Sequence, residues 1–248
     1  MLRAYGDGNL FGETYGEGPV RVVWLHGWAR RGQDFSAAAS ELAQSAISSV
    51  ALDLPGFGAS PLPLVTGGAR TYAELVAPAL REISDQPLVL VGHSLGGRIA
   101  SVVAANHPEL VKGLVLCGAP LVGRAHAAPP WSYRALRWMH AHSFVGDERM
   151  EAARQRFGSI DYRNASGALR AVLVAMVNES YEDELVRVVA PVSFLWGARD
   201  EVVPLDIARR AMALLAGAHS LRVVEGVGHL LPTEAPHELV ASVREAVA

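Results

Sequence analysis

Short apolar runs recur along the chain, and most of them are continuous rather than alternating with polar residues. Six runs rich in β-branched residues are predicted strands, at 20–25, 49–54, 87–91, 113–117, 191–196 and 220–225. Five stretches with helical spacing lie between them, at 34–45, 71–83, 95–106, 204–215 and 236–247. Continuous apolar strands are typical of parallel sheets covered on both faces. The alternation predicts an α/β fold with a mostly parallel twisted sheet and helices on both faces.

One interval interrupts this alternation. Two further strands are predicted within the first 18 residues, which makes 113–117 the sixth strand. From 121 to 189 the spacing is helical and aromatic residues are frequent. A structureless connection of that length is uncommon in a compact domain. We therefore expect a helical cap at 121–189, inserted into a core formed by 1–120 and 190–248.

Composition narrows the class of protein. The chain has 248 residues, of which 50% are hydrophobic, a formal net charge of -3 and a pI near 6.3, so no electrostatic footprint for nucleic acid is present. No signal-like N-terminus and no long apolar run is found, which predicts a cytoplasmic protein without membrane association. We expect it to be a monomer or a homodimer. The single cysteine, Cys117, allows no internal disulfide and no cysteine cluster, and neither a metal nor another cofactor is expected.

A serine stands between glycines at the end of a predicted strand. The segment GHSLGG covers residues 92–97, directly after one predicted strand and before a predicted helix. Such a turn lifts the Ser94 hydroxyl above the carboxyl edge of the sheet, while Gly92 and Gly96 let the neighbouring backbones pass close. The alternative is an ordinary glycine-rich turn, because a lone G-x-S-x-G occurs by chance in many proteins. The flanking strand and helix favour a nucleophile.

A serine nucleophile needs a base, and the base needs an acid that fixes its tautomer. Of the nine histidines, His229 lies in GVGHLL just after the last predicted strand, at the carboxyl edge where Ser94 is also expected. Asp200 lies in WGARDEVVP after the preceding strand and is the predicted acid. Its rivals are the adjacent Glu201 and a purely structural role in a solvated turn. The chain order Ser, Asp, His favours Asp200 for this architecture.

Two backbone amides are predicted to stabilise an oxyanion. The N–H of Leu95 is free at the start of the helix after the nucleophile. The second donor is expected in WLHGWARR, where Gly27 allows the chain to bend so that the N–H of Trp28 points at the same place. We expect His26 to support this loop by hydrogen bonding rather than to exchange protons with substrate. His93 is expected to support the turn beside the nucleophile.

Taken together, these segments resemble the α/β-hydrolase superfamily, in its capped branch with an HG-x oxyanion loop. The resemblance is carried by His26-Gly27-Trp28, Asp53-Leu54-Pro55-Gly56-Phe57-Gly58, Gly92-His93-Ser94-Leu95-Gly96-Gly97, Trp196-Gly197 with Asp200, and Gly228-His229 followed by Glu234 and Pro236. They span nearly the whole chain in the order of that family. The resemblance implies an α/β-hydrolase fold with the cap inserted after the sixth strand.

Two branches of the superfamily share further details with the chain. HGW with DLPGFG resembles pimeloyl-carrier-protein methyl ester esterases, although those often have tryptophan at the position of His93. Arg98, which completes SLGGR, resembles the menaquinone-pathway lyase of the same fold, where an arginine helps to hold an anionic substrate. Ser94 differs from haloalkane dehalogenases and epoxide hydrolases, which use aspartate there. Arg98 is therefore a candidate for substrate binding.

The residues predict a serine hydrolase, a carboxylesterase that cleaves a small-molecule or acyl ester through an acyl-enzyme. The same catalytic residues would also serve C–C bond hydrolysis, a lyase reaction or perhydrolase chemistry. A ligand receptor that has kept the hydrolase fold without activity is a further alternative. An intact set of Ser94, Asp200 and His229 argues against the receptor.

The cap is expected to select the substrate by covering the site with its aromatic residues, and Trp131 and Trp138 are the candidates for contact. Between 121 and 170 the cap carries eight arginines and four acidic residues. This excess could attract an acidic carrier protein or a carboxylate substrate, although a solvated arginine-rich helix face is the expected explanation. A small-molecule ester is the expected partner.

Overall fold

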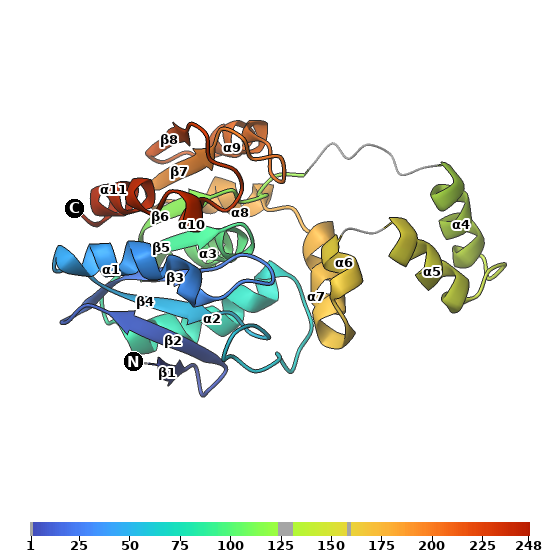
Figure 1. Ribbon diagram of the computed structural model, residues 1–248, viewed down its shortest axis with the longest axis horizontal. Helices are drawn as coiled ribbons and strands as arrows, with labels where there is room; N and C mark the ends of the chain where they lie inside the picture. The colour runs from blue at the N-terminus through green and yellow to red at the C-terminus, as the bar shows by residue number, and fades with distance from the viewer. Residues whose placement is uncertain (1, 124–130, 158–159) are drawn as a thin grey trace.

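The computed structural model describes residues 2–123, 131–157 and 160–248, and its centre is one eight-stranded sheet (Figure 1). The strand order is β1-β2-β4-β3-β5-β6-β7-β8. Strands β1 and β2 pair antiparallel, as do β2 and β4, and the remaining pairs are parallel. The strands are β1 (Leu2–Tyr5), β2 (Leu10–Tyr15), β3 (Val20–Leu25), β4 (Ser48–Asp53), β5 (Leu88–His93), β6 (Val111–Cys117), β7 (Val192–Gly197) and β8 (His219–Val224). The predicted mostly parallel α/β sheet is confirmed.

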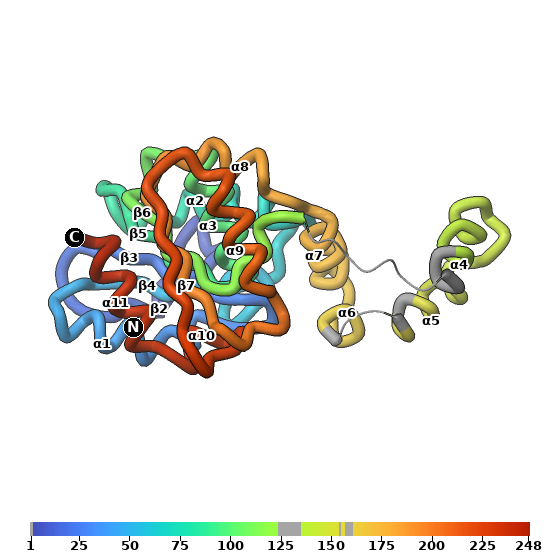
Figure 2. The backbone as a smooth tube through the Cα atoms, turned by 90° about the horizontal axis from the view of Figure 1, so that it is seen from above, coloured from blue at the N-terminus to red at the C-terminus, as the bar shows by residue number. Residues whose placement is uncertain are grey.

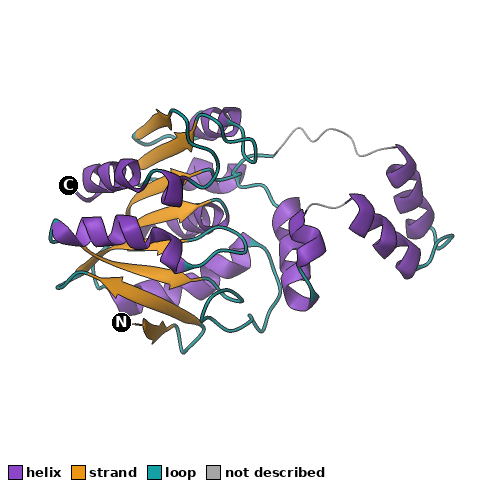
Figure 3. Cartoon of the chain, in the orientation of Figure 1, coloured by secondary structure: helices purple, strands orange, loops and turns teal. Residues whose placement is uncertain are grey.

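Helices cover both faces of the sheet, and each face has its own buried core (Figure 3). One face packs on α1 (Ser36–Gln44) and α11 (Pro236–Val247). The other packs on α2 (Ala69–Ile83), α3 (Leu95–Asn106) and α9 (Leu205–Met212). Because β5 lies between these two layers, all six of its residues are buried. This double burial explains why the strand sequences are continuously apolar.

Every element that the structure describes between β6 and β7 is a helix, as the interrupted strand pattern predicted. These elements are α4 (Trp131–Ala141), α5 (Asp147–Phe157), α6 (Ile160–Asn164), α7 (Gly167–Asn178) and α8 (Glu182–Arg187). Helix α8 packs against α3 of the core. Helices α6 and α7 lie beside the carboxyl edge of the parallel strands, and α4 and α5 pack on each other further out (Figures 1 and 2).

The structure differs from the predicted elements mainly at their ends. The helix predicted at 204–215 ends at Met212, and its last predicted residues form turns through backbone hydrogen bonds. A short helix, α10 (Leu231–Glu234), follows β8 in a segment without a predicted element. Pro232 in its first turn and only four residues of length give it little periodic signal.

The helices within the described part of the chain include none that is long and apolar enough to cross a bilayer.

Strand order brings five loops to one place. Strands β3, β5, β6, β7 and β8 are consecutive neighbours in the sheet and run parallel. The loops after their carboxyl ends therefore meet at one edge, although they are distant along the chain. Those loops carry Trp28, Ser94, Gly118, Asp200 and His229.

Candidate active site

Ser94 occupies a strained turn between β5 and α3. Its backbone angles are φ 49° and ψ -106°, a conformation that residues with a side chain rarely adopt. Three backbone hydrogen bonds hold it there. The Ser94 N–H donates to Cys117 O at 2.8 Å, and the Ser94 carbonyl accepts from Gly97 at 3.2 Å and Arg98 at 3.3 Å. The turn presents the side chain at the carboxyl edge of the sheet.

Two glycines around Ser94 are required by close contacts. A Cβ on Gly92 would lie 2.5 Å from the Gly97 Cα, and a Cβ on Gly96 would lie 1.9 Å from the Leu25 carbonyl oxygen. Both neighbours are backbone atoms, which cannot move aside as a flexible side chain can. The roles predicted for Gly92 and Gly96 are thus matched by the packing of β5, α3 and β3.

The strain at Ser94 predicts a gain in stability when it is relieved. A Ser94→Gly variant should unfold with a free energy about 1 kcal/mol higher than the wild type, because glycine adopts a positive φ without steric cost. Chemical denaturation measures this difference. Ser94→Ala is the matched control, since alanine keeps the Cβ and the strain. Equal stability of the glycine and alanine variants would contradict the prediction.

His229 and Asp200 form a hydrogen-bonded pair. The distance between His229 Nδ1 and Asp200 Oδ2 is 2.8 Å, and the Asp200 side chain is 1% exposed. The other carboxylate oxygen, Oδ1, accepts the backbone N–H groups of Val202 at 2.9 Å and Val203 at 2.7 Å. Because the carboxylate accepts a hydrogen bond from Nδ1–H, the neutral His229 ring carries its proton on Nδ1, and Nε2 is the nitrogen that can take up another proton.

Ser94 and His229 both lie against the end of β6. The carbonyl that Ser94 binds belongs to Cys117, and the next residue, Gly118, has φ 53°. A Cβ on Gly118 would lie 3.0 Å from the His229 ring and 3.1 Å from Asp200 Oδ2. Among the described residues, the Ser94 hydroxyl makes no hydrogen bond to His229 or to any other group. Catalytic hydrogen bonds are often long without substrate and shorten in the Michaelis complex.

His93 lies under this group and contacts the loop of the base. Its ring centroid is 4.9 Å from that of His229, and its Nε2–H donates to the backbone carbonyl of His229 at 2.8 Å. On its other side, a Cβ on Gly27 would lie 2.9 Å from His93 Nδ1. Burial, then the neighbouring His229, lowers the pKa of His93 to about 3. His93 is therefore a neutral link between the nucleophile turn, the loop of the base and the oxyanion loop.

His26 joins the loop after β3 to the loop after β4. Its Nδ1–H donates to Gly27 O at 2.7 Å, and its Nε2 accepts from the backbone N–H of Leu54 at 2.9 Å. Both ring nitrogens are thus used by the neutral imidazole. Burial lowers the pKa of His26 to about 4. This geometry suits the supporting role predicted for His26.

The two buried histidines predict sensitivity to acid. Both titrate near 6.5 when unfolded, and their folded pKa values lie near 4 and 3. The unfolded chain therefore binds more protons below pH 6.5, and stability that is complete above this pH falls as the pH drops toward 4. By about pH 4.5 each histidine should contribute on the order of 2–3 kcal/mol of this loss.

The acid sensitivity is measured by urea unfolding of wild type and His93→Gln at neutral pH and near pH 4.5. The loss between the two conditions should be smaller in the variant, by about 2–3 kcal/mol. Other titrating groups cancel in this comparison. The same pH dependence in both proteins would show that His93 does not resist protonation.

The two residues whose amides are predicted as oxyanion donors, Trp28 and Leu95, line the same cavity as Ser94. Among the described residues, neither the N–H of Trp28 nor that of Leu95 donates to a protein acceptor. The N–H of Gly96 is taken by His26 O at 3.0 Å, which fixes the oxyanion loop against the start of α3. The Trp28 ring packs edge-on against Phe57, with centroids 5.1 Å apart. Both amides thus lack a protein acceptor in the part of the chain that the structure describes, and their role as oxyanion donors stays a prediction.

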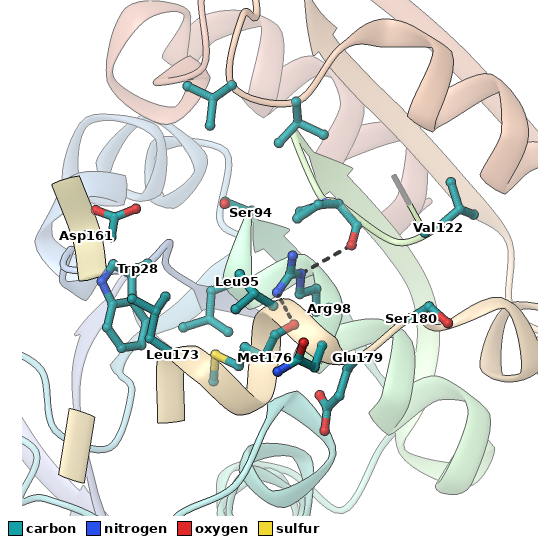
Figure 4. Close-up of a pocket in the computed structure, with 16 residues that line it drawn as sticks. Trp28, Ser94, Leu95, Arg98, Val122, Asp161, Leu173, Met176, Glu179 and Ser180 are labelled. Atoms are coloured by element: carbon teal, nitrogen blue, oxygen red, sulfur yellow. Dashed lines mark hydrogen bonds between the residues drawn. The ribbon is translucent and has the colours of Figure 1, made fainter. Parts of the chain in front are cut away.

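A cavity of about 400 Å³ opens beside Ser94 (Figure 4). Ser94, Leu95 and Trp28 line one part of it, and Leu173 and Met176 of α7 line another. Further apolar lining comes from Val122, Val177, Val202 and Val203, and charged groups come from Arg98, Asp161 and Glu179. A volume in this range suits a small or medium ligand.

The cavity wall contains residues that sequence reasoning missed. Leu173, Met176 and Val177 come from α7, where their spacing of three and four is the helical signal that could have marked one face. Trp138 does not line the cavity. It lies on α4, is 58% exposed and stacks on Phe144 at a centroid distance of 6.1 Å. The prediction relied on aromatic residues, whereas the cap helix α7 lines the cavity with Leu173, Met176 and Val177.

The remaining substrate-binding predictions have different outcomes. Trp131 begins α4, but its side chain lies outside the described residues. Arg98 lines the cavity and hydrogen-bonds to two backbone carbonyls, those of Pro120 and Met176. Substrate contact by Trp131, Trp138 and Arg98 stays a prediction.

The described residues contain no group of three or more His, Cys, Asp and Glu side chains placed to hold a metal ion. Cys117 is fully buried in β6, and burial raises the pKa of its thiol.

Known proteins resemble this chain in sequence and in fold. A pimeloyl-[acyl-carrier protein] methyl ester esterase from Chromobacterium violaceum is 36% identical over 220 residues, which are 81% of this chain and 84% of that protein. The esterase from Exiguobacterium antarcticum superimposes with a TM-score of 0.75 at 22% identity, covering 100% of this chain and 98% of the other. A bacterial membrane phospholipase A superimposes with a TM-score of 0.74 at 25% identity, covering 100% of this chain and 84% of the other.

The sequence pattern of the alpha/beta hydrolase family matches residues 22–243, which include the candidate nucleophile, acid and base. This match and the esterase relatives agree with the fold that the strand order and the site at the carboxyl edge of the sheet indicate. The chain belongs to the alpha/beta hydrolase family and is a hydrolase of the esterase type.

Proposed function

We propose that the chain is a serine carboxylesterase that cleaves small or medium acyl esters through an acyl-enzyme on Ser94. The observation that carries the proposal is the His229–Asp200 hydrogen bond of 2.8 Å beside a serine in a strained turn, next to a cavity of about 400 Å³. A base with a fixed tautomer near a serine hydroxyl that lines a cavity is what nucleophilic acyl transfer needs.

In the first step, Ser94 Oγ attacks the ester carbonyl while His229 Nε2 takes the hydroxyl proton. Asp200 stabilises the resulting imidazolium, and the amides of Trp28 and Leu95 stabilise the oxyanion. The C–O bond to the alcohol then breaks, and the alcohol leaves with the proton from His229. In the second step, water loses a proton to the same nitrogen and attacks the acyl-enzyme, which releases the acid and restores Ser94.

The apolar wall from α7 favours a largely apolar acyl group, and we propose that the cap at 121–189 selects it.

A panel of p-nitrophenyl esters from acetate to dodecanoate tests the proposal by stopped-flow kinetics. A burst of p-nitrophenol followed by a slower steady rate is expected, with kcat/KM falling for the longest chains. Turnover without detectable acylation of the protein would contradict it, and no turnover with binding would favour a receptor.

A methyl ester on a carrier-bound acyl chain is the second candidate. The observation that favours it is the 36% identity to a pimeloyl-[acyl-carrier protein] methyl ester esterase over most of both chains. The rate of methanol release is compared between two methyl esters of the same acyl chain. In one the far end of the chain is attached to a carrier protein, and in the other it is a free carboxylic acid. A clear preference for the carrier-bound ester would select this candidate, and equal rates would reject the carrier.

A further inference from the structure

Arg98 lies one helical turn after Ser94 and reaches across the cavity wall. Its Nε–H donates to the Pro120 carbonyl at 3.2 Å, and its Nη1–H donates to the Met176 carbonyl at 2.9 Å (Figure 4). One bond therefore goes to the chain leaving β6, and the other goes to α7 of the cap. The side chain connects three segments that surround the cavity.

The bond to α7 is favourable for a general reason. Met176 belongs to the last turn of α7, which ends at Asn178, where carbonyls lack the usual partner four residues further on. Besides Arg98, its carbonyl accepts a long bond of 3.4 Å from the N–H of Glu179, the residue that caps the helix. The C-terminus of a helix carries partial negative charge, so a cation placed there is stabilised. The C-terminus of α7 thus stabilises the positive charge of Arg98.

The segment after α7 is fixed at the same place. The Tyr181 side chain is fully buried, and the guanidinium carbon of Arg98 lies 5.7 Å from its ring centre. The Tyr181 N–H donates to Leu121 O at 3.0 Å, and its hydroxyl donates to Glu179 Oε2 at 2.8 Å. That carboxylate oxygen also accepts the N–H of Ala69 at the start of α2, at 2.8 Å.

We propose that Arg98 is a positioning residue that holds the C-terminal turn of α7 against the nucleophile helix, and so sets how the acyl cavity is closed above Ser94. This inference rests on the proposed function for its effect on catalysis. The role differs from recognition of a substrate carboxylate. Because Arg98 acts through Met176 and Tyr181, its loss affects neutral and anionic acyl groups alike.

Matched substrates separate the two roles. Arg98→Met removes both hydrogen bonds, and Arg98→Lys keeps the charge without the fork that reaches two carbonyls. The substrates are p-nitrophenyl pentanoate and mono-p-nitrophenyl glutarate, whose acyl chains are similar in length but end in a methyl group or a carboxylate. In both variants kcat/KM should fall about tenfold for both esters, mainly through KM. The ratio between the esters should stay within about threefold of the wild-type ratio.

A selective loss on the glutarate ester in Arg98→Met, with recovery in Arg98→Lys, would overturn the proposal in favour of carboxylate binding. Unchanged kinetics in both variants would overturn it as well. Arg209→Met, which removes an exposed arginine from α9, is the control for loss of charge and should behave as the wild type.

Hydrogen–deuterium exchange provides a readout that does not require activity. The amides of Glu179 and Tyr181, which donate to Met176 and Leu121, should exchange faster in Arg98→Met than in the wild type. Exchange in Ser94→Ala should match the wild type. Protection that is unchanged in Arg98→Met would refute the positioning role. If the wild type hydrolyses no ester, the proposed function fails, and the exchange experiment still decides the role of Arg98.

Discussion

Replacing Ser94 with alanine is expected to lower kcat/KM for p-nitrophenyl butyrate by about 10⁵-fold or more. The variant keeps the cavity and the free amides of Trp28 and Leu95, so substrate still binds. It lacks the oxygen that forms the acyl-enzyme, so the ester can react only by direct attack of water, which is much slower. Steady-state kinetics with highly purified protein measures the loss.

Ser40→Ala is a suitable control for the Ser94 variant. Ser40 is exposed on α1 and does not line the cavity beside Ser94, so its loss should leave kcat/KM unchanged. Activity of Ser94→Ala within tenfold of the wild type would mean that another group is the nucleophile.

Asp200→Asn is expected to lower kcat by about 10⁴-fold while KM changes little. The reason lies in how the carboxylate is held. Oδ1 accepts the N–H groups of Val202 and Val203, so the asparagine oxygen stays with them and the NH₂ group turns to His229 Nδ1. The imidazole must then carry its proton on Nε2, where it cannot take the proton of Ser94.

Glu201→Gln tests the neighbouring carboxylate, which the sequence offered as an alternative. Glu201 is exposed, whereas the Asp200 side chain is almost completely buried. The Glu201 variant should keep wild-type kcat. A larger loss of kcat in Glu201→Gln than in Asp200→Asn would show that Glu201, and not Asp200, is the acid.

The sheet and the positions of the candidate catalytic residues were predictable because both follow from local patterns. Continuous apolar strands indicated a parallel sheet, and in a parallel sheet all carboxyl ends meet at one edge. Ser94, Asp200 and His229 each follow such a strand, so their common edge required no knowledge of side-chain contacts. Gly92 and Gly96, two residues before and after Ser94, indicated a tight turn, and in the structure a Cβ on either would meet backbone atoms.

The cavity wall could not be predicted in the same way. Which face of α7 turns toward Ser94 depends on contacts between the cap and the core, such as the bond from Arg98 to Met176. These partners are far apart in the sequence and include a backbone carbonyl, which has no sequence signature. The same holds for the bond between His93 and the carbonyl of His229.

Labelling with a fluorophosphonate tests the central assignment most directly. Peptide mapping by mass spectrometry should find one adduct, on Ser94, formed quickly in the wild type and slowly in Asp200→Asn. Ser94→Ala should remain unlabelled. A wild-type protein that hydrolyses esters while Ser94 stays unmodified would contradict the account.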